Sequence, residues 1–201
     1  MPKEVEFPAA ASFLMNALTA RNALDTLKLP RGASLLVTGA AGAVGTHAVA
    51  LAHSEGVRVV AIASAEDEAF LRAAGADDVI PRGDDAVERV RDAVPTGVDA
   101  VLDAAGLGRE VAPAVRDKGT IITLRPGSDG SLERGIEPVF VNVRERVADH
   151  AAIARLGQQV ASGLLALRVA AIYPAAEAAA AHRQLEEGGQ RGRLILTFDG
   201  V

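Results

Sequence analysis

Short apolar runs alternate along the chain with segments whose apolar positions recur every three to four residues, as in amphipathic helices. The runs are rich in Val, Ile and Leu, which is typical of strands buried on both faces of a sheet. Strands that alternate with helices imply right-handed crossovers and parallel pairing. The pattern predicts an α/β fold, a doubly wound parallel sheet with helices on both faces. The predicted strands are 34–38, 57–63, 78–80, 98–102 and 120–124, and the helices between them are 46–54, 66–74, 84–93 and 109–116.

Different patterns flank this series. An Ala- and Leu-rich helix is predicted over Phe7–Leu27, ahead of a turn at Pro30–Gly32. After Pro126 a loop at 127–131 leads to a further strand at 138–141 and a long helix over 146–162. The chain ends in a predicted strand, helix and strand at 169–173, 175–187 and 193–198. We therefore divide the chain into a helix and linker (1–30), a central α/β domain (31–145) and a C-terminal part (146–201).

A glycine-rich turn joins the first strand to the next helix. A dinucleotide's pyrophosphate needs such a turn, because backbone N–H groups and the positive end of the helix dipole must reach the phosphates unobstructed. Gly42 suits the close approach, and Gly45 suits tight packing of the helix on the strand, although Ala40 replaces the first glycine of the usual motif. The turn predicts a Rossmann-type site that includes Gly39, Ala41, Gly42, Ala43, Val44 and Gly45. The alternative is a glycine turn that serves packing alone.

The second strand bears on the choice of cofactor. It ends at Ser64 without the carboxylate that would hold the ribose 2′-hydroxyl of NAD. Ser64 and Arg82 are candidates to bind the 2′-phosphate of NADPH, but Glu66, Asp67 and Glu68 would repel it. The alternative is that these acids only favour the dipole of a helix first turn and touch no ligand. The cofactor is therefore predicted to be NADPH or NADH, with a lean towards NADPH.

Composition excludes several other functions. The 201 residues contain no cysteine, and the four histidines lack metal-ligand spacing, so no metal is expected. Aromatic residues make up 3% of the chain and the net charge is −5, which argues against nucleic-acid binding. No apolar run approaches a membrane span, and the first residues lack a secretory layout. The expectation is a soluble cytoplasmic protein.

Four stretches of the sequence together resemble the zinc-free quinone oxidoreductase branch of the medium-chain dehydrogenase/reductases. They cover nearly the whole chain in family order: AASFLMNALTA (10–20), LVTGAAGAVG (36–45), FLRAAGADDVI (70–80) and the scattered positions Tyr173-Pro174, Glu177-Ala178, Ala181–Arg183 and Gly192–Leu194. The resemblance implies that Asn16, Thr19, Ala104, Ala105 and Leu124 lie near the nicotinamide. Alternatively, Asn16 and Thr19 are helix residues that only hydrogen bond locally.

The sequence also departs from that family. Relatives that use NADPH usually have a lysine where Asp67 stands and often a tyrosine near Arg82. Family members begin with a β-rich domain of roughly a hundred residues, on domain-length priors, which is missing ahead of Phe7. The resemblance implies that the strands at 169–173 and 193–198 are a remnant of the substrate domain and normally join that domain's sheet. Unpaired edges invite another chain, so a homodimer or a separate subunit that completes the cleft is expected.

The resemblance implies hydride transfer from NAD(P)H to a small electrophilic carbonyl, quinone or enoyl substrate, in which most of the chemistry belongs to the cofactor. No catalytic side chain is assigned. His47, His182, Tyr173 and Arg125 are candidates, and each is also consistent with a packing or surface role. The alternatives are a truncated or repurposed domain that binds nucleotide or a partner without redox turnover, and a non-redox biosynthetic enzyme.

Overall fold

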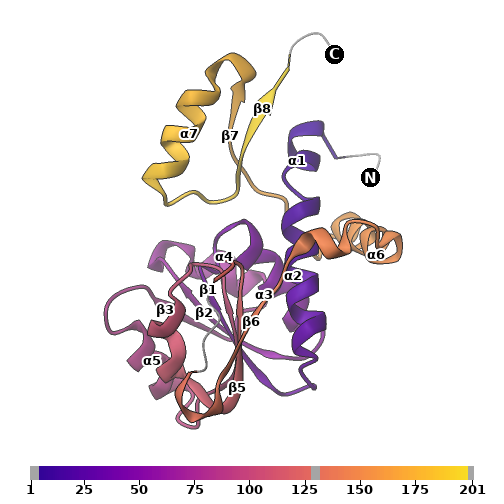
Figure 1. Cartoon of the computed structure of the whole chain (residues 1–201). Helices are drawn as coiled ribbons and strands as arrows, with labels where there is room; N and C mark the ends of the chain where they lie inside the picture. The colour runs from indigo at the N-terminus through magenta and orange to yellow at the C-terminus, as the bar shows by residue number, and fades with distance from the viewer. Residues whose placement is uncertain (1–4, 128–131, 199–201) are drawn as a thin grey trace.

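A six-stranded parallel sheet forms the centre of the molecule (Figure 1), in a computed structural model that describes residues 5–127 and 132–198. The strands lie in the order β3-β2-β1-β4-β5-β6, and every adjacent pair is parallel. This order reverses between β1 and β4. The predicted α/β, doubly wound fold is therefore confirmed. The strands are β1 (Ser34–Thr38), β2 (Arg58–Ala63), β3 (Asp78–Pro81), β4 (Val98–Asp103), β5 (Val115–Thr123) and β6 (Glu137–Phe140).

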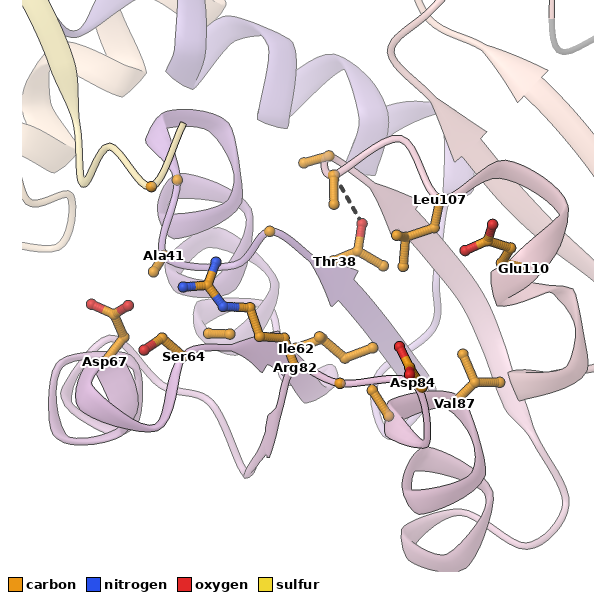
Figure 2. Close-up of a pocket in the computed structure, with 18 of the residues that line it drawn as sticks. Thr38, Ala41, Ile62, Ser64, Asp67, Arg82, Asp84, Val87, Leu107 and Glu110 are labelled. Atoms are coloured by element: carbon orange, nitrogen blue, oxygen red, sulfur yellow. Dashed lines mark hydrogen bonds between the residues drawn. The ribbon is translucent and has the colours of Figure 1, made fainter. Parts of the chain in front are cut away.

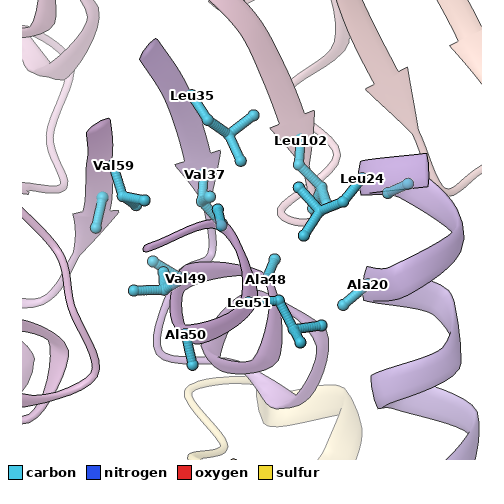
Figure 3. Close-up of a cluster of buried hydrophobic side chains, with 14 of the residues drawn as sticks. Ala20, Leu24, Leu35, Val37, Ala48, Val49, Ala50, Leu51, Val59 and Leu102 are labelled. Atoms are coloured by element: carbon cyan, nitrogen blue, oxygen red, sulfur yellow. The ribbon is translucent and has the colours of Figure 1, made fainter. Parts of the chain in front are cut away.

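Helices cover both faces of the sheet because apolar residues alternate between the two faces along each strand. On one face, Leu35 and Val37 of β1 pack with α2 (Leu14–Leu27) and α3 (Ala43–Ser54), as Figure 3 shows. On the other face, Leu36 packs with α5 (Ala86–Ala93) and the 3₁₀ helix η2 (Gly108–Ala114). All three β1 side chains are fully buried. Burying a side chain of this size contributes about 1.5–3 kcal/mol, so the sheet has a substantial core of its own.

The N-terminal helix is interrupted, which corrects the single helix predicted over 7–27. The structure has α1 (Phe7–Ala11) and then α2, separated at Ser12 and Phe13. The Ser12 hydroxyl donates to the Ala9 carbonyl at 2.6 Å, and the Phe13 side chain turns inward to meet the His47 ring edge-on. A side-chain hydrogen bond that competes with the helix and a buried aromatic ring both favour the break.

Several other predicted elements differ in type or in their boundaries. The helix predicted at 109–116 is the 3₁₀ helix η2, because Pro113 lies inside it and has no N–H to donate, and β5 begins already at Val115. The long helix α6 spans His150–Ala161 rather than 146–162, and the Asp149 carboxylate caps it through the N–H of Ala152 at 2.9 Å. Helix α3 begins at Ala43 rather than Thr46, with Gly42 as its N-cap.

Short elements connect these parts. They are η1 (Ala65–Asp67), α4 (Glu68–Ala73), η3 (Glu133–Gly135) and η4 (Val143–Arg146). Of the predicted loop at 127–131, residues 128–131 lie outside the described residues. Within residues 5–127 and 132–198, no helix is long and apolar enough to cross a membrane.

The last part of the chain forms a second, smaller sheet. Strands β7 (Val169–Pro174) and β8 (Arg193–Thr197) pair in parallel, with η5 (Ala175–Glu177) and α7 (Ala178–Glu187) between them. We call this the C-terminal unit. It lies beyond the end of the large sheet, with α1 against both of its strands (Figure 1). In the part of the chain that the structure describes, each of the two strands has one hydrogen-bonded neighbour. The predicted strand, helix and strand are thus present, while the domain boundaries at 31 and 146 stay a prediction.

Candidate nucleotide-binding site

A cavity of about 1040 Å³ opens where the carboxyl ends of β1, β2 and β4 meet. The strand order reverses here, between β1 and β4, and open α/β sheets bind their ligands at such a point. In Figure 2, Ser64, Asp67 and Arg82 gather at one end of the cavity, and Leu107 and Glu110 stand at the other. The fold therefore forms a cavity at the place where the glycine-rich turn leaves β1.

Close packing makes glycine necessary in this turn. A Cβ on Gly45 would lie 2.4 Å from the Gly39 carbonyl oxygen and 2.7 Å from the Ala40 Cα, which no side chain tolerates. A Cβ on Gly42 would lie 3.1 Å from the same oxygen, which also accepts the Gly42 N–H at 2.9 Å. The predicted packing role of Gly45 is confirmed. Gly42, the N-cap of α3, lines the cavity, so the start of this helix borders the space where a phosphate would bind.

A buried carboxylate shapes the opposite wall of the cavity. Asp103, at the end of β4, accepts the Thr38 hydroxyl at 2.6 Å. It also accepts hydrogen bonds from three backbone N–H groups of the turn that follows. They belong to Gly106, Leu107 and Gly108, at 3.0, 3.1 and 2.8 Å. The Thr38 hydroxyl oxygen in turn accepts the Ala105 N–H at 3.0 Å. This role of Asp103 was not predicted from the sequence, although an Asp followed by a glycine-containing turn is a recognisable signal.

The C-terminal unit reaches the cavity through a loop. Gly189, Gln190 and Arg191 join its lining from the segment between α7 and β8. The Arg191 Nε donates to Asp67 at 2.6 Å and its Nη2 to Glu66 at 2.8 Å. These hydrogen bonds, first to Asp67 and then to Glu66, raise the pKa of the Arg191 guanidinium. Asp67 is therefore a buried, paired residue that lines the cavity.

A second arginine of the C-terminal part touches the glycine-rich turn itself. The Arg168 guanidinium lies 4.1 Å above the centre of the Phe70 ring and donates to the Ala41 carbonyl at 3.3 Å. Its burial lowers the pKa of Arg168, and the nearby Asp67 partly offsets this. The turn is thus supported from outside the sheet by a residue far along the chain.

The predicted site residues fall into two groups. The cavity is lined by Gly39, Ala41, Gly42, Ser64, Arg82, Ala104 and Ala105. The others do not line it. Ala43, Val44 and Gly45 form the first turn of α3, Leu124 packs against the core, and Asn16 and Thr19 lie in α2. Cofactor contacts of either group stay a prediction.

Asn16 and Thr19 make the local hydrogen bonds that the sequence analysis gave as the alternative to a place near the nicotinamide. The Asn16 Nδ2 donates to the Ser12 carbonyl at 2.7 Å, and the Thr19 hydroxyl donates to the Met15 carbonyl at 2.7 Å. Both acceptors lie four residues earlier in the same segment. A local role is therefore present for each residue, whatever else it contacts.

The candidate acids and bases are buried, engaged in packing or hydrogen bonds, or exposed at the surface. Burial lowers the pKa of His47 to about 4, so this imidazole is neutral at pH 7. His182 is exposed on α7, and the Tyr173 hydroxyl donates to Gln184 in the same unit. Arg125 packs over Gly106, where a Cβ would lie 2.9 Å from the Arg125 Cζ. Nothing in this geometry assigns a catalytic side chain.

Zinc ligands are a separate question. Zinc sites in proteins use Cys, His and carboxylate ligands, and the chain contains no cysteine. Among residues 5–127 and 132–198, no three His, Asp or Glu side chains come together as a metal site. These residues do not fit a zinc ion.

Comparison with known proteins decides the family. The family model described as zinc-binding dehydrogenase matches residues 74–196. The chain belongs to this family. Its predicted likeness to the quinone oxidoreductases of the medium-chain dehydrogenase/reductase superfamily is confirmed.

Two relatives and two solved structures illustrate the likeness. An NADPH-dependent alkenal/one oxidoreductase of Arabidopsis thaliana is 33% identical over 125 residues, 61% of this chain and 31% of that protein. A quinone oxidoreductase of Pongo abelii is 25% identical over 98% of this chain and 64% of its own length. A mycobacterial protein complexed with NADPH superposes with a TM-score of 0.84 at 29% identity, over 98% of this chain and 66% of that one. The Coxiella burnetii quinone oxidoreductase superposes with a TM-score of 0.84 at 28% identity, over 96% of this chain and 62% of that one. The chain thus spans between about one third and two thirds of these proteins' length.

Proposed function

We propose that this chain binds a nicotinamide dinucleotide in the cavity and acts in NAD(P)H-dependent reduction of a small electrophilic carbonyl, quinone or enoyl compound. The observation that carries the proposal is the glycine turn at the start of α3, which opens into a cavity at the switch point of the sheet. The alkenal/one and quinone oxidoreductases among its relatives support the reaction class.

The cavity has suitable groups for each part of the cofactor. The pyrophosphate would lie against the N-terminus of α3 at Gly42, where N–H groups and the helix dipole favour negative charge. The adenosine ribose would lie beside Ser64 and Arg82, at the carboxyl end of β2. Ala104 and Ala105, held by the Thr38 and Asp103 hydrogen bonds, would form the wall towards the nicotinamide.

NADPH is the proposed cofactor of the two. Arg82 and Arg191 line the cavity near Ser64, beside Asp67. Either guanidinium would attract a 2′-phosphate. The alkenal/one oxidoreductase is NADPH-dependent by name, and the mycobacterial structure was solved with NADPH, which supports the same choice.

The bound nicotinamide would supply the hydride, and the chain would supply binding, orientation and exclusion of water. Because His47 is neutral and buried and the Tyr173 hydroxyl is engaged with Gln184, neither is assigned as a proton donor.

Deuterium transfer tests the activity directly. The full chain is incubated with NADPH that carries two deuterium atoms at nicotinamide C4 and with a panel of α,β-unsaturated ketones and aldehydes. Their reduction forms a C–D bond that does not exchange with water, and the products are examined by mass spectrometry. Deuterium in a product is expected, and it should be absent with the Gly42→Asp variant, whose new carboxylate would repel the pyrophosphate. Gly157→Asp is the matched control, since this glycine in α6 has open space around it. Absence of labelled product with every substrate would contradict the reductase activity of the chain.

We further propose that another chain completes the cleft, as a second copy or as a separate subunit. Strands β7 and β8 have free edges in the described residues, and Phe7, Ile172 and Phe198 expose more than half of their surface nearby. Exposed apolar side chains beside unpaired strands are typical of protein interfaces. Light scattering after gel filtration should give the mass of two chains, or of a complex with a co-purified subunit. The mass of one chain at micromolar concentration would contradict the proposal.

A further inference from the structure

Two hydroxyl–carboxylate pairs join β1 to β4, one at each end of these parallel strands. At the amino end, the Ser34 hydroxyl donates to the Asp99 carboxylate at 2.9 Å. At the carboxyl end, the Thr38 hydroxyl donates to the Asp103 carboxylate at 2.6 Å. Thr38 lines the cavity, whereas Ser34 and Asp99 do not. The two ends therefore carry the same pair of groups, one beside the candidate site and one away from it.

The pair at the carboxyl end is the more deeply buried. Thr38 is 0% exposed and Asp103 is 3% exposed, while the Asp99 side chain at the other end is 31% exposed and also accepts the Arg116 Nε at 2.7 Å. A buried carboxylate must find hydrogen-bond donors, and Asp103 finds them in the backbone of the turn at 106–108. Hydrogen bonds to an ionised acceptor are strong. Asp103 therefore fixes the position of this turn relative to β4.

The turn after β4 lies directly against the glycine-rich turn after β1. A Cβ on Gly39 would lie 3.2 Å from the Ala105 nitrogen and 3.4 Å from the Ala104 carbonyl carbon. The Thr38 hydroxyl oxygen accepts the Ala105 N–H at 3.0 Å, the bond drawn as a dashed line in Figure 2. One hydroxyl thus binds both the Asp103 carboxylate and the backbone of the next turn. Its two hydrogen bonds set the spacing between the two turns.

This spacing matters for the second half of a dinucleotide. Rossmann-type folds bind a dinucleotide across the point where the strand order reverses, with the adenosine ribose at the end of the second strand. The adenosine half would therefore lie at Ser64 and the pyrophosphate at Gly42, the N-cap of α3. The remaining half would extend past the glycine-rich turn to Ala104 and Ala105, which line the cavity at the end of β4.

We propose that Thr38 and Asp103 are positioning residues for the nicotinamide half of the cofactor. This inference rests on the proposed nicotinamide dinucleotide site. Neither side chain acts on the reacting atoms, because both act through the backbone at Ala104 and Ala105. The adenosine half lies at the end of β2, away from this pair, and its binding does not depend on them. The pair therefore governs the affinity that the nicotinamide adds to binding.

Titration calorimetry of the full chain with NADPH and with 2′-phospho-ADP-ribose tests the proposal, because the second ligand lacks only the nicotinamide. Thr38→Val removes the hydroxyl at nearly the same size. It should weaken NADPH binding roughly tenfold and change binding of 2′-phospho-ADP-ribose by less than about twofold, since hydrogen bonds that hold the turn are lost. Thr38→Ser keeps the hydroxyl and should bind both ligands as the wild type does. Asp103→Asn should act in the same direction as Thr38→Val.

The amino-end pair supplies the matched controls. Ser34→Ala and Asp99→Asn remove the same groups from the same two strands, away from the cavity, and should leave the affinity for both ligands unchanged. The fluorescence of bound NADPH gives a second readout, because it reports the surroundings of the reduced nicotinamide. With Thr38→Val it should move towards that of the free cofactor, and with Ser34→Ala it should stay as in the wild type.

The outcomes separate this inference from the proposed function. If the wild type binds neither ligand, the dinucleotide site itself is refuted. If the wild type binds both ligands with equal affinity, the nicotinamide adds nothing and the inference is overturned while the site stands. The inference is also overturned if Thr38→Val weakens both ligands equally, or weakens NADPH no more than Ser34→Ala does. Retained binding of 2′-phospho-ADP-ribose by each variant shows that the site is still folded.

Discussion

The large sheet and the C-terminal unit bury their side chains to different extents. In β1 and β4 almost every side chain is buried, and helices cover both faces of the sheet. Within 169–198, only Ala181 and Ile195 are buried, although the unit has the same alternation of strand, helix and strand. The sheet thus carries its own hydrophobic core, whereas the C-terminal unit packs against α1 and contacts the large sheet through Arg191.

The same substitution in the two regions should have very different effects on stability. Leu102 of β4 is fully buried, and Leu185 of α7 is 55% exposed. Leu102→Ala should lower the free energy of unfolding by about 2–5 kcal/mol, since it leaves a cavity in the core. Leu185→Ala should change it by less than about 0.5 kcal/mol. Urea unfolding of both variants measures this, and similar losses would contradict the contrast between the regions.

The buried His47 should make the free energy of unfolding depend on pH. Burial lowers the pKa of His47 from its ordinary value of 6.5 to about 4, so the unfolded state binds the proton more readily. The contribution of His47 to the free energy of unfolding should therefore be complete above pH 6.5. It should fall by up to about 3 kcal/mol as the pH drops towards 4. His47→Gln should flatten this dependence. A dependence that survives His47→Gln would refute the assignment.

Replacing a buried carboxylate should lower the free energy of unfolding more than replacing an exposed one. Asp103→Asn replaces an acceptor of four hydrogen bonds by an amide that cannot accept them all, so a loss of about 1.5–3 kcal/mol in the free energy of unfolding is expected. Hydrogen exchange of the amides at 106–108 should also become faster. Glu187→Gln, on the exposed end of α7, should stay within about 0.5 kcal/mol. Equal effects of the two substitutions would show that the Asp103 network does not hold the turn.

The smallest expected effect belongs to the contact that joins the two regions. Arg191→Gln should cost only about 0–1 kcal/mol of stability, because Glu66 is exposed and Arg191 itself is 41% exposed. Thermal unfolding compared with Arg193→Gln measures the difference. A loss above about 2 kcal/mol would mean that the pair holds the C-terminal unit in place rather than serving a ligand.

Local patterns in the sequence were enough for the sheet. Apolar runs such as 34–38 and 98–102 predicted the strands, and the glycines after β1 predicted the turn, because burial on both faces and tight packing leave a direct mark on neighbouring residues. The break at Ser12 and the 3₁₀ helix around Pro113 depend on single side chains within helical composition, so periodicity alone missed them.

Local sequence patterns predicted only part of the candidate site. Residues next to the predicted strand ends, such as Gly42 and Ala104, do line the cavity. The pairing of Arg191 with Asp67 joins positions far apart in the chain, and no local pattern records such a contact. The three acids after Ser64 were therefore judged without the arginine that neutralises two of them.

The most direct test of the account is titration calorimetry of the full chain with NADPH, in the wild type and in the Gly42→Asp and Gly157→Asp variants. Binding at micromolar strength is expected for the wild type and for Gly157→Asp, and loss of binding for Gly42→Asp, because the pyrophosphate would lie at the N-terminus of α3. No binding up to millimolar NADPH, or binding that Gly42→Asp leaves intact, would contradict a dinucleotide site at this turn.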